Sequence, residues 1–194
     1  MTVQSRPYGF RPVGTLNGTS WQGQVFTYKK EASVIITTGD PVVLAGSAEA
    51  GTGIATITRA QGSEGTPGTI TGVVVGIAPI RSDLSKTYLA AADEGYVRVC
   101  VGANVLYQIQ EDAVGGNIAL TSIGQGADMV VADGDTTTGY SQTLIDSSTA
   151  GTDAQLQLLG IVQNTDELSS IGSGFQNFIV RINENTFAGA GTLI

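Results

Sequence analysis

Short stretches rich in β-branched and apolar residues recur along most of the chain, and glycine or Asx turns separate them at intervals of about eight to twelve residues. Within 105–110, Val105, Tyr107 and Ile109 alternate with less apolar positions, which predicts a strand with one buried face and one mixed face. Similar stretches predict further strands at 24–28, 33–38, 42–44, 54–58, 69–77, 96–101, 117–121, 129–132, 142–146, 155–163 and 178–183. This rhythm is typical of a β-sandwich or a β-barrel.

Two connections between these strands carry specific predictions. Gly102-Ala103-Asn104 separates 96–101 from 105–110, so we expect these two stretches to form a hairpin. Gly, Ser, Thr and Ala dominate 46–68, which favours a surface loop around the strand at 54–58.

Residues 82–94 are the candidate helix. Ser82 is suited to an N-cap, Leu84 and Leu89 share a face with Tyr88, and Gly95 is suited to end the helix. A segment of this length and mixed propensity needs tertiary packing to stay helical. A loop with a single turn is therefore the alternative.

The chain is expected to be all-β, with one sandwich or barrel-like domain of short antiparallel strands over 21–194 and at most one short helix. A length of 194 residues and a hydrophobic content of 41% suit one well-cored domain. Residues 1–20 are expected to form an extended N-terminal arm, because Pro7 and Pro12 fix φ and disfavour both a helix and a central strand.

Charge divides the chain near the same place. Residues 1–30 carry four basic residues and no acidic one, whereas the other five basic residues face all seventeen acidic residues in 31–194. Arginine and aromatic side chains are enriched at protein interfaces. The arm is therefore expected to dock on a protein partner through Arg6, Pro7, Tyr8, Gly9, Phe10, Arg11 and Pro12. The net charge of −8 disfavours nucleic acid as that partner.

Neither a membrane segment nor a reactive thiol is predicted. The start of the chain lacks a hydrophobic leader, and the apolar run 73–80 is interrupted by Gly76 and Pro79, so we expect cytoplasmic synthesis without membrane insertion. The single cysteine, Cys100, lies in an apolar stretch and is expected to be a small buried side chain.

Catalytic chemistry has little support in the sequence. The chain has no histidine, which excludes Ser-His-Asp and Cys-His catalysis and removes the commonest zinc ligand. Adjacent carboxylates at 93–94, 111–112 and 166–167 lie beside turn residues and are expected to be solvated loop acids. Asp133 and Asp135 match the start of a calcium loop, but the later ligands are missing, so we expect a turn. We predict a non-enzymatic protein with no cofactor and no metal.

Several short motifs resemble sequences in small structural proteins of tailed-phage heads. These motifs are Arg6-Pro7-Tyr8-Gly9-Phe10-Arg11-Pro12-Val13, Thr38-Gly39-Asp40-Pro41-Val42, Leu159-Gly160-Ile161-Val162 and Val180-Arg181-Ile182-Asn183-Glu184. In them the chain is similar to the decoration, or cement, proteins that bind the outside of a capsid. The resemblance implies a β-rich protein, often a homotrimer, that is made in the host cytoplasm, contacts the major capsid protein where capsomers meet and reinforces the expanded shell of the virion.

Three alternatives remain open from the residues alone. A virion carbohydrate-binding or adhesion module would use exposed aromatic residues such as Tyr107 or Tyr140. A head–tail structural component would share the interface chemistry of the arm. A polysaccharide hydrolase would need one of the carboxylate pairs as acid and base.

Trp21 and Phe26 are interpreted as core residues of the first strand, with a contact role as the alternative.

Overall fold

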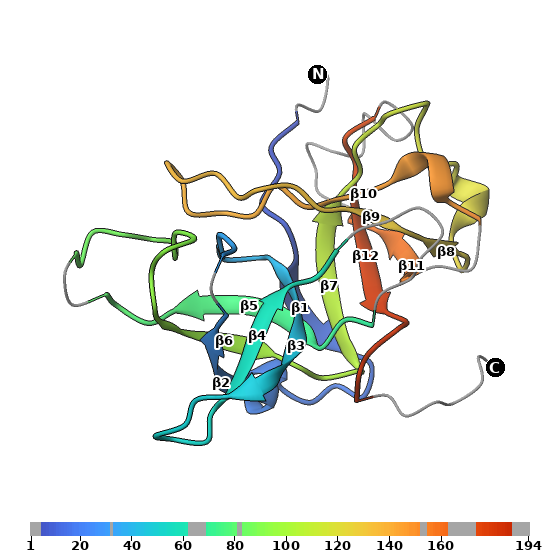
Figure 1. The fold of residues 1–194 in the computed structure, drawn as a ribbon. Helices are drawn as coiled ribbons and strands as arrows, with labels where there is room; N and C mark the ends of the chain where they lie inside the picture. Colours follow the sequence, from blue (N-terminus) through green and yellow to red (C-terminus); the bar gives the residue numbers. More distant parts are fainter. Residues whose placement is uncertain are drawn as a thin grey trace.

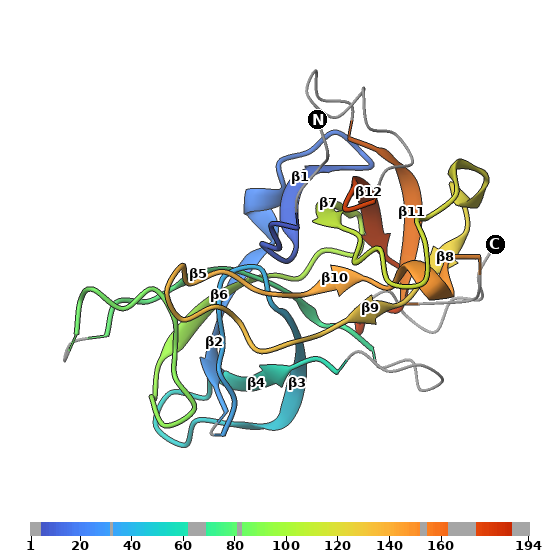
Figure 2. The ribbon, with the colours of Figure 1, turned by 90° about the horizontal axis from the view of Figure 1, so that it is seen from above.

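The computed structural model describes residues 5–31, 33–61, 69–80, 83–151, 155–162 and 174–187. The predicted all-β class is confirmed, because these residues form short strands, mostly antiparallel, and the helical segments among them are 3-10 turns of three or four residues. The strands, labelled in Figure 1, fall into two neighbouring groups, a barrel and an open sheet, which Figure 2 shows apart.

The barrel is closed by five strands in the order β2-β4-β3-β5-β6. Their bounds are β2 (Val25–Lys30), β3 (Pro41–Ala48), β4 (Ala55–Arg59), β5 (Gly72–Ile77) and β6 (Tyr96–Cys100). Most pairs are antiparallel, but β2 and β4 pair in parallel, with Lys29 opposite Thr56. Apolar side chains fill the barrel, and the buried ones are Ile36, Val42, Ile57, Val74, Leu89, Val97 and Val99.

The open sheet has the strand order β1-β7-β12-β11-β8, which leaves β1 at one edge. Its strands are β1 (Arg11–Thr15), β7 (Val105–Gln110), β8 (Gly126–Ala127), β11 (Leu156–Ile161) and β12 (Asn177–Ile182). The expected alternation in β7 is confirmed, because Val105, Tyr107 and Ile109 are all fully buried. One core cluster joins both groups, since Val73 and Cys100 of the barrel belong to the same cluster as these residues.

Smaller elements complete the fold. They are the paired strands β9 (Met129–Val130) and β10 (Leu144–Ile145), and the 3-10 turns η1 (Trp21–Gln24), η2 (Leu120–Ser122) and η3 (Ser147–Thr149). The connection from β9 to β10 extends over one end of the barrel, where Asp133 pairs with Arg59 of β4 and Tyr140 bridges to Thr38 (Figure 1).

The predicted hairpin across Gly102-Ala103-Asn104 is wrong. Strand β6 pairs with β2 and β5, whereas β7 pairs with β1 and β12. The connection therefore leads from the barrel into the open sheet. Turn chemistry specifies a local reversal or bend, but the strands that pair are selected by long-range packing.

The predicted helix over 82–94 is also wrong within the described part of that segment, 83–94, which consists of turns and bends. Asp83 accepts hydrogen bonds from both the backbone N and the Oγ of Ser85, an Asx turn that competes with a helix. Leu89 pairs with Ile36 and is fully buried in the barrel, while Leu84 is 78% exposed. The apolar residues thus do not share one buried face.

Three further predictions need correction. Residues 33–38 form only isolated bridges at Ile36 and Thr38, and 117–121 contains the start of η2 instead of a strand. The strand expected at 54–58 is present as β4, but the stretch before it, expected as loop from residue 46, begins with the end of β3. Residues 62–68 lie outside the described ranges.

Candidate functional site

The N-terminal segment docks on its own chain, so the expectation of a separate arm over 1–20 is wrong for its described part. The backbone N of Arg6 donates to Gln110 Oε1 at 2.8 Å, and the hydroxyl of Tyr8 donates to Asn177 Oδ1 at 2.6 Å. Residues Arg11–Thr15 are β1, which pairs with β7. The two prolines are compatible with this placement because β1 is an edge strand.

Two of the motifs singled out in the sequence pack against each other at this docking point. Gly9 has φ +67°, and a Cβ on it would lie 2.5 Å from the carbonyl oxygen of Gly39. The same oxygen accepts a hydrogen bond from the backbone N of Phe10 at 2.9 Å. Glycine is required at position 9 by both the positive φ and the close approach. The segments 6–13 and 38–42 thus form one structural junction.

Phe10 was predicted to contact a partner, but it is a core residue of its own chain. It is 2% exposed, and its ring meets that of Tyr107 edge-on, with centroids 5.8 Å apart and an interplanar angle of 86°. Gly9 is also buried. Of the seven predicted contact residues, these two are buried and serve the fold alone. The other five are exposed or half-buried and can present their chemistry outward, although Tyr8 also bonds to Asn177.

A groove lies beside these outward-facing residues, at the junction of β1 with the barrel. It has a volume of about 180 Å³ and is lined by Tyr8, Phe10, Arg11, Pro12, Trp21, Thr38, Val74, Val75 and Tyr140. We call it the aromatic groove. Arg11 is exposed, and its guanidinium carbon lies 4.6 Å from the centroid of the Tyr8 ring. Among the described residues that line the groove, Arg11 alone carries a charge.

The sequence did not place all of these residues together. Trp21 was interpreted as core, and the structure gives it both roles, because it packs partly buried against the core while it lines the groove. Tyr140 is 46% exposed and reaches the groove from the connection between β9 and β10. Phe26, the other candidate core residue, is 55% exposed and lies outside the groove. No periodic pattern links positions 8, 21 and 140.

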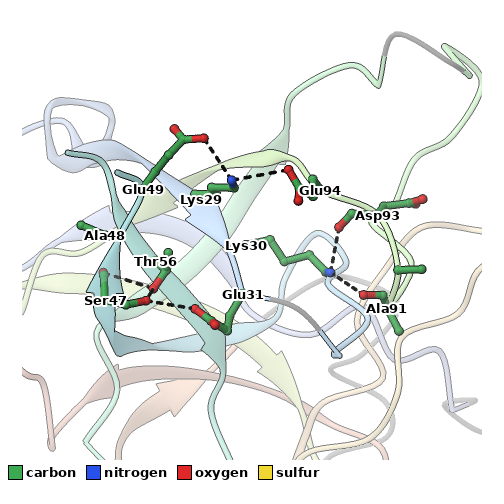
Figure 3. Close-up of a pocket in the computed structure, with 11 residues that line it drawn as sticks. Lys29, Lys30, Glu31, Ser47, Ala48, Glu49, Thr56, Ala91, Asp93 and Glu94 are labelled. Carbon is green, nitrogen blue, oxygen red and sulfur yellow. Dashed lines mark hydrogen bonds and ion pairs between the residues drawn. The ribbon is translucent and has the colours of Figure 1, made fainter. Parts of the chain in front are cut away.

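A second hollow, the charged cleft, lies against the barrel between β2 and the segment 91–94 (Figure 3). Its volume is about 330 Å³. Lys29 Nζ lies 3.0 Å from Glu49 Oε1 and 3.5 Å from Glu94 Oε2. Lys30 is buried, and its Nζ donates to the carbonyl oxygens of Ala91 and Asp93 at 3.0 and 2.9 Å. Both lysines of the cleft thus have partners within the chain.

The ion pair of Glu49 and Lys29 is not tuned for proton transfer near neutral pH, whereas burial lowers the pKa of Lys30. Hydrogen bonds from Thr52, Tyr96 and Lys29 lower the pKa of Glu49 to about 2. The hydrogen bond to Glu49 raises the pKa of Lys29, so both partners stay ionised. A general acid or base works best with a pKa near the working pH. The geometry favours a structural role for the cleft, in which Lys30 ties the segment 91–93 to β2.

The adjacent carboxylates also serve the fold. Glu111 was expected to be solvated, but it is fully buried, which raises its pKa. Its Oε2 accepts from the backbone N of Ile118 at 2.7 Å, and its Oε1 accepts from the backbone N of Gln176 at 3.2 Å. Asp93 pairs with Lys86 at 2.9 Å. The pair at 166–167 lies outside the described ranges.

The aspartates that match the start of a calcium loop interact with other residues of the chain. Asp133 pairs with Arg59 at 2.7 Å, and Asp135 Oδ1 accepts a hydrogen bond from the backbone N of Thr137 in a turn. Within the described ranges, no group of three or more His, Cys, Asp or Glu side chains is arranged to hold a metal ion. Cys100 is fully buried, as predicted, and burial raises the pKa of its thiol.

Comparison with protein-family models, with curated proteins and with solved structures gives no match to this chain. None of the helices among the described residues has the length and apolar character needed to cross a lipid bilayer. The aromatic groove is the candidate site on its own chemistry, because it gathers aromatic side chains around an exposed arginine.

Proposed function

We propose that this protein is a non-enzymatic structural protein of a phage virion. In this proposal it binds the outside of an icosahedral head, contacts the major capsid protein and stabilises the expanded capsid by bridging capsomers. The observation that carries the proposal is the aromatic groove, where Tyr8, Arg11 and Pro12 of the N-terminal segment lie beside Trp21 and Tyr140. Sequence resemblance to decoration proteins supplies the class of partner.

The chemistry of this surface suits protein recognition. Tyrosine, tryptophan and arginine are the residue types that contribute most to binding energy at protein interfaces. Next to the groove, β1 adds the exposed apolar side chain of Val13, and Leu16 follows directly after the strand, with exposed fractions of 45% and 53%. These side chains add exposed apolar surface that a partner can remove from water.

A trimer, which the resemblance implies, would place three such grooves on one particle. Linked sites bind a repeating surface with an avidity that exceeds that of a single site by about 10²–10⁴-fold. Moderate affinity at each groove is then sufficient for stable attachment to a capsid, whose subunits repeat with fixed spacing.

Co-sedimentation with undecorated expanded heads of the phage that encodes the protein tests the proposal. The full chain is required, because removal of residues 1–14 would delete Phe10 and most of β1 and so damage the core. We expect saturable pelleting with the heads and a higher temperature of head disruption in the decorated particles. Absence of pelleting at micromolar protein would reject a decoration role and move the assignment to a head–tail component or an adhesion module.

A carbohydrate-binding module is the second candidate, because Tyr140 is half exposed beside Tyr8 and Trp21. Sugar rings present apolar faces that pack on aromatic side chains. A glycan-array signal that is lost in Tyr140→Ala would support this function. Tyr107, the other residue considered for this role, is fully buried and does not meet a ligand.

A further inference from the structure

We propose that the aromatic groove binds a peptide segment of the capsid subunit in which a carboxylate side chain lies beside an apolar side chain. The inference rests on the proposed function and specifies its contact. Three features of the groove, its size, its charge and the edge strand beside it, lead to this occupant.

The size of the groove suits side chains of a larger partner. Pockets that enclose a whole small-molecule ligand have volumes of roughly 300–1,000 Å³. The groove, at about 180 Å³, lies below that range. Its walls are apolar, because Trp21 and Val75 face it together with the buried Phe10 and Val74. An apolar side chain that enters this space is removed from water on several sides, which stabilises the complex.

The charge of the groove selects a carboxylate. Arg11 forms no ion pair with any carboxylate of the described residues, in contrast to Lys29, Arg59 and Lys86. Its guanidinium carbon lies over the Tyr8 ring, 4.6 Å from the centroid. A guanidinium can contact an aromatic face and still form paired hydrogen bonds to a carboxylate. The chain as a whole has a net charge of −8. The protein surface outside the groove therefore repels a polyanionic partner such as nucleic acid.

The edge strand next to the groove limits how the segment binds. Strand β1 has a free side in the sheet order, but it contains Pro12, which has no N–H, and its pairing shifts register between Pro12 and Gly14. Proline and bulges at an edge oppose the addition of another strand. The partner segment is therefore held by side chains in the groove, and the selectivity comes from its carboxylate and its apolar group.

Four variants of the full chain test the inference against heads. Arg11→Glu reverses the charge in the groove, and Arg98→Glu makes the same change at an exposed arginine of β6 that does not line the groove. Tyr140→Ala removes an aromatic wall, and Phe26→Ala removes an exposed aromatic ring elsewhere. Loss of a desolvated charge pair weakens binding by about 30-fold or more. We expect this loss in Arg11→Glu, a smaller one in Tyr140→Ala, and wild-type binding in both controls. Unchanged melting temperatures establish that all four variants are folded.

A second measurement uses Trp21, the single tryptophan of the chain, as a reporter inside the groove. Overlapping synthetic peptides that cover the capsid subunit, with each tryptophan replaced by phenylalanine, are titrated into the full chain. We expect one acidic peptide to shift the Trp21 emission saturably, and expect about 30-fold weaker binding when its Asp or Glu is replaced by Asn or Gln.

The outcomes separate the inference from the proposed function. Wild-type chain that does not bind heads overturns both. Equal binding of heads by the wild type and Arg11→Glu overturns the groove contact while the decoration role stands. If a peptide shifts the Trp21 emission equally with and without its carboxylate, the charge argument is rejected. Self-association of the wild type that disappears in Arg11→Glu identifies a second copy of this chain as the occupant, and also overturns the inference.

Discussion

Replacement of Phe10 by alanine tests whether the N-terminal segment is part of the folded core. The side chain is 2% exposed and belongs to the cluster that joins the barrel to the open sheet. Phenylalanine-to-alanine changes at such sites lower the free energy of unfolding by about 3–5 kcal/mol, because they remove buried apolar surface and leave a cavity. The edge-on contact with Tyr107 accounts for about 0.5–1.5 kcal/mol of this value.

The assay is urea unfolding followed by the emission of Trp21, which packs partly buried against the same core cluster. Phe26→Ala is the matched control, because this side chain is 55% exposed on β2 and its removal is expected to change the free energy by less than about 0.5 kcal/mol. A loss of less than about 1 kcal/mol in Phe10→Ala would refute the docked segment and restore the separate arm. Equal large losses in both variants would mean that burial does not determine how much free energy of unfolding each ring contributes.

The remaining predictions concern the junction and the buried polar groups. Gly9→Ala is expected to destabilise the fold by more than about 1 kcal/mol, and by more than Gly18→Ala does. Both glycines have positive φ, but a Cβ at Gly18 meets open space. Thermal melting of the two variants measures the difference. Lys30→Met is expected to lower the free energy of unfolding by about 1–3 kcal/mol, because it leaves the carbonyls of Ala91 and Asp93 without their buried donor. Amide hydrogen exchange at 91–93 should accelerate in this variant. Burial raises the pKa of Asp40, so the native state holds this proton to higher pH than the unfolded chain does, and the free energy of unfolding should fall as pH rises through and above the ordinary range near 3.8. Asp40→Asn keeps an oxygen acceptor for Thr37 and should flatten this pH slope in urea titrations; an unchanged slope would assign it to other groups.

The sequence predicted most strands because their signal is local. Alternation in 105–110 marked a buried face, and one more step along the same alternation reaches Glu111, which is the signal that would have predicted its burial. Strand partners were not predictable in this way, since the turn after β6 has the same residues whether the chain returns to β6 or crosses to another sheet. Phe10 was misassigned because aromatic residues between prolines and arginines have the composition of an exposed contact, and only its Tyr107 neighbour, distant in sequence, decides otherwise.

The candidate site, like the strands, was predictable only where its signal is local in the sequence. Its N-terminal half was predicted from residue types, whereas Trp21, Val75 and Tyr140 reach the groove from three different connections and strands. No spacing rule relates such positions, because the fold alone brings them together. Conversely, the glycines at 9 and 39 have a clear physical signature, since both adopt positive φ at a contact where a side chain would meet backbone atoms.

The docking of the first strand has a consequence for the order of events during synthesis. Arg11 pairs with Gln108, and the hydroxyl of Tyr8 bonds to Asn177, 169 residues later in the chain. The segment can complete these contacts only after residue 177 has left the ribosome, and such distant pairings also form slowly. The groove is thus a product of completed folding. Any assembly that recruits this protein through the groove accepts finished subunits and leaves truncated or misfolded chains behind.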